Sequence, residues 1–342
     1  MKTKWKITWI VLIVLIGLSG AYGGYYYKNS HPVPVAMNRR HRSKGYLDYS
    51  WNGRIGHNQL INNSKRVPKL KLAKSVVAMD ANTGRVIYQR NADQPRQVAS
   101  ISKLMTLFLV ERKANQVPRG WSQIVNTDDS QLKKMGRNSE VGGFKFQSHH
   151  RYTVKDLFQA ALIKSSNNAA IALGQWVAGN NRNFVKMMNQ QARIWHLKAH
   201  FVSASGLENN DLKRYGYMVN KDPNGANWLS ARSVAIIAQH LLVKYPSILK
   251  DSKQESVKIN GQTVNNLDNL LPGRAYAKPN LKVDGLKTGF TPRAGYCFVG
   301  TEQPKRHQDR IITVVLHDEK EFTDTRTLMN YLYRHDALLN RK

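Results

Sequence analysis

The sequence predicts an α+β fold, in which an antiparallel sheet is flanked by helices and accompanied by a helical lobe. Two observations support this class. Segments with strand character lie near both ends of the folded region, and a block of helical segments lies between them. Strands segregated from helices along a chain are typical of α+β domains. With 342 residues, 41 % of them apolar, the chain has enough apolar material for a sizeable core.

The first strands are predicted to form a hairpin. Residues 75–80 and 85–90 have strand character, and the turn residues Asn82-Thr83-Gly84 lie between them. After a polar loop, the run 103–112 is apolar nearly all round, which predicts a buried helix. Ser100 lies just before this run, at the predicted start of the helix.

The middle of the chain is predicted to be helical. A capping-box pattern at residues 153–156 opens a helix that runs through Ile163. Further helices are predicted at 168–177, 181–196 and 230–243. Strands are predicted at 283–287, 295–300 and 310–316, followed by a closing helix at about 323–339. We expect the hairpin and the last strands to join in one sheet, with the closing helix on one face.

The N-terminus has the form of an export signal. Three lysines within the first six residues precede the apolar run 10–18. Residues 1–27 are therefore predicted to be either a signal peptide, cleaved near Ser19-Gly20-Ala21, or an uncleaved membrane anchor. Both alternatives place the rest of the chain outside the cytoplasm.

Residues 28–70 are predicted to be a basic linker, and residues 71–342 the folded domain. The linker lacks helical or strand periodicity. The chain carries 53 Lys and Arg against 22 Asp and Glu, a formal net charge of +31. Such a charge attracts polyanions, so we expect anionic wall polymers or lipids to bind the basic tail. No recognised nucleic-acid motif is present, and no nucleic-acid partner is expected.

Three short motifs follow one another in the folded region: Ser100-x-x-Lys103, Ser165-Ser166-Asn167 and Lys287-Thr288-Gly289. Each is weak alone, since Ser-x-x-Lys also occurs at Ser130 and Ser247. Only Ser100, however, opens a deeply apolar helix that would exclude water. Together, their order and spacing indicate a serine acyl-transfer site.

The residue types explain the predicted catalytic roles. Ser100 is the predicted nucleophile, and a serine hydroxyl attacks only when a base removes its proton. Lys103 lies three positions later on the same helix face and is the predicted base, provided that desolvation and other cations disfavour its charge. Ser165 is expected to relay the proton to the departing amine. The backbone N–H groups of Ser100 and Phe290 are the predicted oxyanion hole.

The remaining motif residues are predicted to bind the substrate. Asn167 is expected to hold a substrate amide. Lys287 is expected to attract a terminal carboxylate together with the hydroxyl of Thr288. Gly289 has no side chain, so a substrate strand could lie close to the edge of the sheet.

Residues 77–88, 99–106 and 283–291 carry a family resemblance, and residues 201–207 share it. They resemble low-molecular-mass penicillin-binding proteins, most closely the D-alanyl-D-alanine carboxypeptidases of peptidase family S11. The resemblance implies the transpeptidase fold shared with β-lactamases and an acyl-enzyme on Ser100. It also implies substrates that are peptidoglycan stem peptides ending in D-Ala-D-Ala, and β-lactams as covalent inhibitors. Residues 71–342 would then be a serine D,D-peptidase domain at the bacterial membrane or cell wall.

The sequence departs from the family pattern in three ways. The middle motif of the family usually reads Ser-Gly-Asn, and Ser166 takes the place of the glycine, which sets the register on Ser165 and Asn167. Residues 209–227 resemble an extra loop of unknown role. An N-terminal anchor is expected to supply the attachment that many members gain from a C-terminal β-domain and tail.

Other functions remain open at this point. A D,D-transpeptidase or endopeptidase would use the same acyl-enzyme. A class A β-lactamase needs a Glu-x-x-Leu-Asn motif, and Glu208-Asn209-Asn210 does not fit it. Another alternative is a protein that has lost its catalytic activity and binds a cell-wall polymer through its positive charge. No metal or other cofactor is expected, because the sequence lacks a His-Glu-x-x-His motif.

Overall fold

The computed structural model describes residues 67–303 and 310–334. The predicted signal or anchor at 1–27 lies outside these residues, and so does nearly all of the predicted linker at 28–70. Within the part of the chain that the structure describes, no helix is both long enough and apolar enough to cross a membrane.

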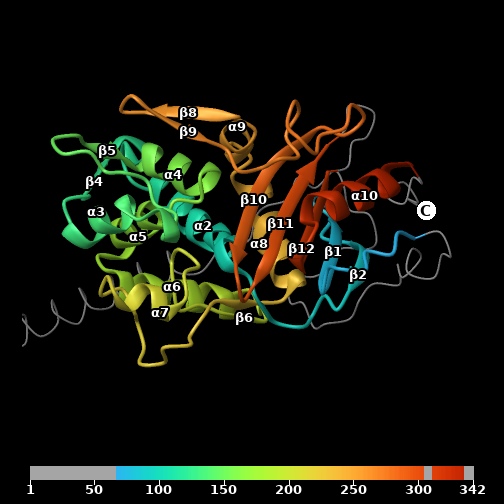
Figure 1. The fold of residues 1–342 in the computed structure, drawn as a ribbon, viewed down its shortest axis with the longest axis horizontal. Coiled ribbons are helices and arrows are strands. Elements are labelled where there is room, and N and C mark those ends of the chain that lie inside the picture. The colour runs from blue at the N-terminus through green and yellow to red at the C-terminus, as the bar shows by residue number, and fades with distance from the viewer. Residues whose placement is uncertain (1–66, 304–309, 335–342) are drawn as a thin grey trace, which may run out of the picture. The chain divides into compact units, whose positions relative to one another are not determined.

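A five-stranded sheet lies at the centre of the described domain (Figure 1). Its strands, in spatial order, are β10 (Val283–Thr291), β11 (Gly295–Glu302), β12 (Ile311–Asp318), β1 (Ser75–Asp80) and β2 (Val86–Arg90). All neighbours in the sheet are antiparallel. The N-terminal hairpin therefore joins the last strands through β1 and β12, as predicted. Within residues 67–303 and 310–334, β10 is an edge strand, and one side of its backbone has no partner strand.

Both faces of this sheet are covered. Helix α8 (Ala231–Lys244) packs on β12 and β1, and α10 (Glu321–Arg334) packs on β12 and β11. Along β1, Val77 belongs to the core of the helical lobe, whereas its neighbour Val76 belongs to the smaller core under α10. Because successive strand residues point to opposite faces, the two helices lie on opposite sides of the sheet.

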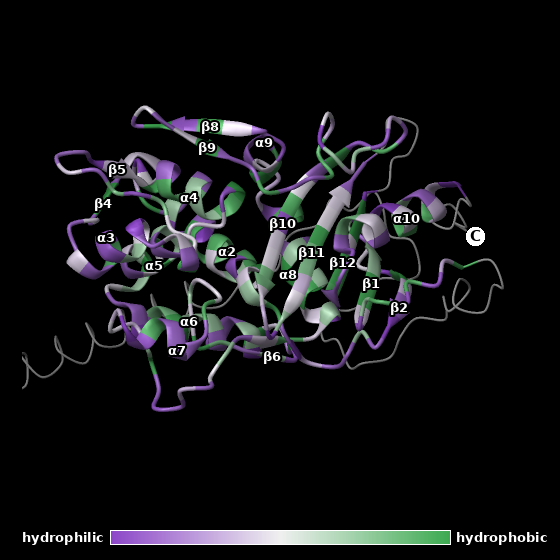
Figure 2. Ribbon diagram, in the orientation of Figure 1, coloured by the Kyte–Doolittle hydropathy of each residue, from purple (hydrophilic) through white to green (hydrophobic). Residues whose placement is uncertain are grey.

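The helical lobe surrounds α2 (Lys103–Ala114), which is buried along most of its length. The other helices of the lobe are α3 (Ser130–Arg137), α4 (Val154–Ile163), α5 (Asn167–Ala178), α6 (Asn181–Ile194), α7 (Asn209–Lys213) and α9 (Ile248–Ser252). The predicted capping box is present at the start of α4. Hydrophobic residues gather on α2 and the central strands, and hydrophilic ones on the outer loops (Figure 2).

Short elements complete the fold. The 3-10 turns are η2 (Ala99–Ser102), η3 (Gly120–Ser122) and η4 (Ser139–Val141). The small sheets consist of β3 (Arg96–Gln97), β7 (Trp228–Leu229) and β6 (Ala199–His200), of β4 (Ile124–Val125) and β5 (Tyr152–Thr153), and of β8 (Ser256–Ile259) and β9 (Gln262–Asn265).

The structure corrects some element boundaries. The strand predicted to end at Lys287 continues to Thr291, because β11 pairs with it over its whole length. Helix α3 lies where the sequence analysis predicted no helix, and it buries just Leu132 and Met135. The hairpin β8–β9 was also missed, and it buries only Ile259 and Val264. Elements that bury so few residues leave a weak periodic signal.

Asn168, at the start of α5, ties this helix to the segment after α3. Its Oδ1 accepts hydrogen bonds from the Phe144 N–H at 2.9 Å and from the Ser166 hydroxyl at 2.8 Å. Its Nδ2 donates to the carbonyl oxygens of Phe144 at 2.8 Å and Leu132 at 3.2 Å. The side chain is fully buried, so these four bonds replace all its contacts with water.

Replacing Asn168 with Ala should lower the free energy of unfolding by about 2–4 kcal/mol, because several buried partners lose their bonds. Urea denaturation of the full chain measures this. Asn210→Ala is the control, since Asn210 is an exposed residue of α7. Equal midpoints for the two variants would contradict the role given to Asn168.

Candidate active site

Ser100 lies in the turn η2, which leads directly into α2. In a 3-10 turn, residues three apart lie one above the other, so the side chains of Ser100 and Lys103 meet. Lys103 Nζ lies 2.8 Å from Ser100 Oγ. Ala99, just before the serine, has a φ of 46°, in the left-handed region. Such a conformation costs of order 1–3 kcal/mol and persists only where the surroundings impose it.

The amine of Lys103 is enclosed by acceptors. Its Nζ lies 2.6 Å from Asn167 Oδ1 and 2.5 Å from the Ser205 carbonyl oxygen, and the side chain has no exposed surface. Ser165 Oγ lies farther away, at 3.5 Å. The first two atoms can only accept hydrogen bonds. A neutral amine that donates its two N–H bonds to them keeps its lone pair for the hydroxyl of Ser100.

The surroundings also favour the neutral form of this lysine. Burial lowers the pKa of Lys103 well below the ordinary value of 10.5, and the positive charge of Lys287 lowers it further. Lys287 is buried as well. Burial lowers the pKa of Lys287 to about 7, and the nearby carboxylate of Asp268 acts in the opposite direction. Lys103 is therefore suited to accept a proton from Ser100 near neutral pH.

The second motif contributes Asn167 to the site. Asn167 Nδ2 donates to the carbonyl oxygen of Val141, and its backbone N–H donates to Gly142 at 3.0 Å. These bonds turn Oδ1 toward Lys103. Asn168 points instead to the segment after α3, so the structure brings Asn167, and not its neighbour, to the lysine.

The two serines of this motif have different surroundings. Ser165 lies between α4 and α5 with a φ of 62°, a second left-handed residue beside the site. Ser166, at the position where the family usually has glycine, caps α5: its Oγ accepts from the Ala169 N–H at 3.3 Å. The departure at Ser166 is thus accommodated as a helix cap.

The third motif lies on the edge strand β10, and η2 packs against it. A Cβ atom on Gly289 would lie 3.0 Å from the Val98 carbonyl oxygen and 3.0 Å from the Ile101 nitrogen. The sequence predicted that Gly289 makes room for a substrate. In the structure, the atoms that approach it are those of the turn that carries Ser100. The glycine therefore allows the nucleophile to lie close to β10.

The side chains of Lys287, Thr288 and Phe290, which surround Gly289 in the sequence, differ in burial. Lys287 is buried, and its Nζ donates to the carbonyl oxygen of Thr288 at 2.9 Å. Thr288 is half-buried, and as the next strand residue it faces the other side of β10. The ring of Phe290 is exposed and stacks on Tyr296, with 4.4 Å between ring centroids. The predicted part of Phe290 in the site is its backbone N–H.

The other copies of the first motif, the single cysteine and the acidic and histidine side chains form no second site of this kind among the described residues. Ser130 and Ser247 are exposed at the starts of α3 and α9, so these two copies of Ser-x-x-Lys do not bury their lysines. Cys297 is buried in β11. In the ranges 67–303 and 310–334, no group of three or more His, Cys, Asp or Glu side chains is placed to hold a metal ion.

Sequence reasoning missed the contribution of the segment at 203–207. The carbonyl of Ser205 accepts from Lys103, and Thr106 Oγ1 donates to the carbonyl of Ala204 at 2.7 Å. A Cβ on Gly206 would lie 2.2 Å from the carbonyl oxygen of Ala99, so only glycine fits there. A backbone carbonyl has no side-chain signature. The segment was noticeable only through its resemblance to the family.

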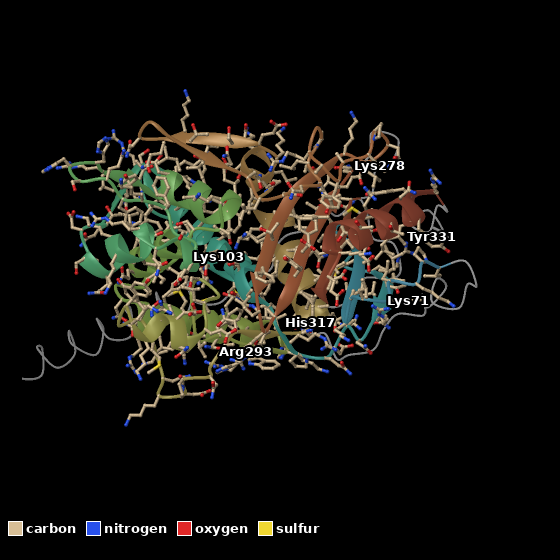
Figure 3. The ribbon with its side chains drawn as sticks, viewed as in Figure 1. Lys71, Lys103, Lys278, Arg293, His317 and Tyr331 are labelled. Carbon is tan, nitrogen blue, oxygen red and sulfur yellow. The ribbon has the colours of Figure 1, made fainter. Side chains whose placement is uncertain are left out.

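The geometry therefore brings Ser100, Lys103 and Asn167 together beside β10, and Figure 3 shows Lys103 where α2 lies beside this strand. The model of peptidase family S11, which is described as D-alanyl-D-alanine carboxypeptidase, matches residues 62–320. The chain belongs to peptidase family S11.

Known relatives of this S11 member support the fold. D-alanyl-D-alanine carboxypeptidase DacA of Haemophilus influenzae is 30 % identical over 71 % of this chain and 56 % of that protein. A peptidoglycan synthesis regulatory factor (PBP3) from Streptococcus pneumoniae shares 35 % identity, with a TM-score of 0.71 over 77 % of this chain and 73 % of that chain. Penicillin-binding protein D2 from Listeria monocytogenes, in a cefotaxime-bound form, shares 31 % identity, with a TM-score of 0.60 over 78 % and 99 %.

The domain thus has the fold of penicillin-binding proteins. The chain spans between 56 % and 58 % of the length of the first curated relatives that it matches.

Replacing Lys287 with Met should shift the acid limb of the pH profile of the acylation rate constant to higher pH. The variant loses the positive charge that lowers the pKa of Lys103, so that pKa rises and the neutral base forms only at higher pH. The effect should be largest below pH 7, where Lys287 itself is charged. The measurement is the rate constant of acylation by a β-lactam as a function of pH, with Lys186→Met on the exposed face of α6 as control. A limb that stays in place or moves to lower pH would contradict the electrostatic coupling.

Proposed function

We propose that this S11 member is a serine-type D-alanyl-D-alanine carboxypeptidase that removes the terminal D-Ala from peptidoglycan stem peptides. The observation that carries the proposal is the buried amine of Lys103, held by two acceptors at 2.5 and 2.6 Å and lying 2.8 Å from Ser100 Oγ. The membership in family S11 and the curated carboxypeptidases among the relatives support the same reaction.

Acylation begins when Lys103 takes the proton of Ser100 and the serine oxygen attacks the carbonyl carbon of the penultimate D-Ala. The carbonyl oxygen becomes an oxyanion, which the N–H groups of Ser100 and Phe290 stabilise. The C–N bond then breaks. The departing D-Ala nitrogen receives the proton from Lys103 through Ser165, whose Oγ lies 3.5 Å from Nζ in the free site. The terminal carboxylate lies in the positive field of Lys287, at the edge near Thr288.

Deacylation completes the cycle. A water molecule gives a proton to Lys103, and its oxygen attacks the ester carbon. The bond between that carbon and Ser100 Oγ breaks, and the serine regains a proton from the lysine. Asn167 is a positioning residue in both steps, because its amide fixes the amine of Lys103.

The same serine should react with β-lactams, and the cefotaxime- and ampicillin-bound forms of the Listeria relative support this. The N-terminal signal or anchor would place the domain outside the membrane, where the substrate lies. The basic tail would hold the enzyme near anionic wall polymers or lipids.

The Ser100→Ala variant should not be labelled by fluorescent penicillin, because no covalent bond can form. Loss of the nucleophile should also reduce the rate of peptide cleavage by on the order of 10⁶, judging from another serine hydrolase. Gel fluorescence after timed labelling measures this, with Ser130→Ala as a control that removes the serine of an exposed Ser-x-x-Lys copy. Undiminished labelling of Ser100→Ala would refute the assignment.

Incubation with a pentapeptide ending in D-Ala-D-Ala should release free D-Ala even when an acceptor amine is present, because water attacks the acyl-enzyme. Mass spectrometry of the products measures the partition. Transfer of the acyl group to the amine as the main product would show a transpeptidase instead.

A further inference from the structure

The proposed function fixes the direction of the substrate along β10. The terminal carboxylate lies near Thr288 and the scissile carbonyl near the N–H of Phe290, so the peptide runs antiparallel to β10. The part before the scissile bond extends past Thr291 toward the turn between β10 and β11. Two or three residues of extended chain span roughly 7–10 Å. The stem residues one and two positions before the penultimate D-Ala therefore lie beside this turn.

Arg293 lies in this turn (Figure 3), and two hydrogen bonds hold its side chain. Nη1 donates to Glu208 Oε2 at 2.7 Å and to the carbonyl oxygen of Asn224 at 3.3 Å. The hydroxyl of Thr291 donates to Glu208 Oε1 at 3.3 Å. The ion pair thus joins the turn after β10 to Glu208, the residue that follows the segment at 203–207.

The segment 209–227, which the sequence predicted to be an extra loop, begins with helix α7, and hydrogen bonds hold its backbone on both sides of Asn224. Asn209 Nδ2 donates to Asn220 Oδ1 at 2.6 Å and to the carbonyl of Asp222 at 2.7 Å. The Asn209 N–H donates to the carbonyl of Gly225 at 2.8 Å. These bonds close the loop around Asn224. The carbonyl oxygen of Asn224 is therefore held in a fixed position beside the guanidinium of Arg293.

One edge of the guanidinium remains available. Within the described residues, Nε and Nη2 of Arg293 form no hydrogen bond with the protein, and the side chain is 47 % exposed. Glu208 is only 14 % exposed, so most of its surface is covered, whereas nearly half of the Arg293 side chain faces solvent. The Nε–Nη2 edge of an arginine matches the two oxygens of a carboxylate.

We propose that Arg293 is a specificity-determining residue, which binds a free carboxylate on the stem peptide upstream of the penultimate D-Ala. The proposal rests on the proposed carboxypeptidase function. Two groups have this chemistry: the α-carboxylate of a γ-linked D-glutamyl residue, and a side-chain carboxylate on the diamino acid that follows it. Both are replaced by carboxamides in amidated stems. The enzyme would then distinguish free from amidated peptidoglycan.

The test uses the full chain and synthetic pentapeptides in matched pairs. One pair differs by carboxylate or carboxamide at the second residue, and the other pair differs in the same way at the third. The wild type should prefer the carboxylate of one pair by about tenfold in kcat/KM, as expected for one charge-assisted bond. The pair that shows the preference identifies the carboxylate. The Arg293→Gln variant should lose this preference and keep the wild-type rate on the amidated peptide.

Three controls separate recognition from structure. Acylation by penicillin, which lacks the upstream peptide, should be unchanged in Arg293→Gln. Arg293→Lys keeps the charge but lacks the planar fork, so it should retain only part of the preference. Arg193→Gln, at an exposed position of α6, should behave as wild type.

Two results would overturn the proposal. One is a wild type that cleaves both members of each pair equally. The other is an Arg293→Gln variant that keeps the preference, or that loses activity on all peptides and on penicillin alike. Failure of the wild type to cleave any pentapeptide would instead refute the carboxypeptidase function, so the two failures are distinguishable.

Discussion

The burial of one amine governs the rest of the site. Lys103 has no exposed surface, and its Nζ contacts groups from η2, from the start of α5 and from the segment at 203–207. A buried ammonium loses its hydration, and a second buried cation, Lys287, makes the charge still less favourable. Burial and the charge of Lys287 thus both disfavour a charged base beside Ser100.

Close backbone contacts hold this arrangement. Gly289 lets β10 lie against the turn of Ser100, and Gly206 lets the 203–207 segment lie against the carbonyl of Ala99. Two residues with side chains have a backbone in the left-handed region: Ala99, next to Ser100, and Ser165, whose Oγ lies 3.5 Å from Lys103 Nζ. Strain of this kind gathers at functional sites, where the surrounding packing over-determines the backbone. Among the described residues, the outer edge of β10 pairs with no other strand, and this is the edge along which we propose that the substrate lies.

The sequence was sufficient to predict the sheet and the contact between Ser100 and Lys103, because short segments of the chain carry both signals. Strand-like segments at both ends of the folded region predicted that the hairpin joins the last strands in one sheet, which the pairing of β1 with β12 confirms. Ser100 and Lys103 lie only three positions apart. Other contacts leave no such signal. Ser205 contributes a carbonyl, which every residue has. Asp268 acts on the pKa of Lys287 through its negative charge, and only the fold brings the two residues close together. Arg293 and Glu208 are 85 residues apart, and nothing in their spacing indicates a pair.

The protonation state of Lys103 can be measured directly by NMR titration of chains with ¹³C-labelled lysine side chains. The Lys103 signal is assigned as the one missing in a Lys103→Arg variant. The neutral-base account predicts that this amine loses its proton well below the ordinary lysine pKa of about 10.4. A Lys103 signal that titrates together with the exposed lysines, near that ordinary value, would contradict it.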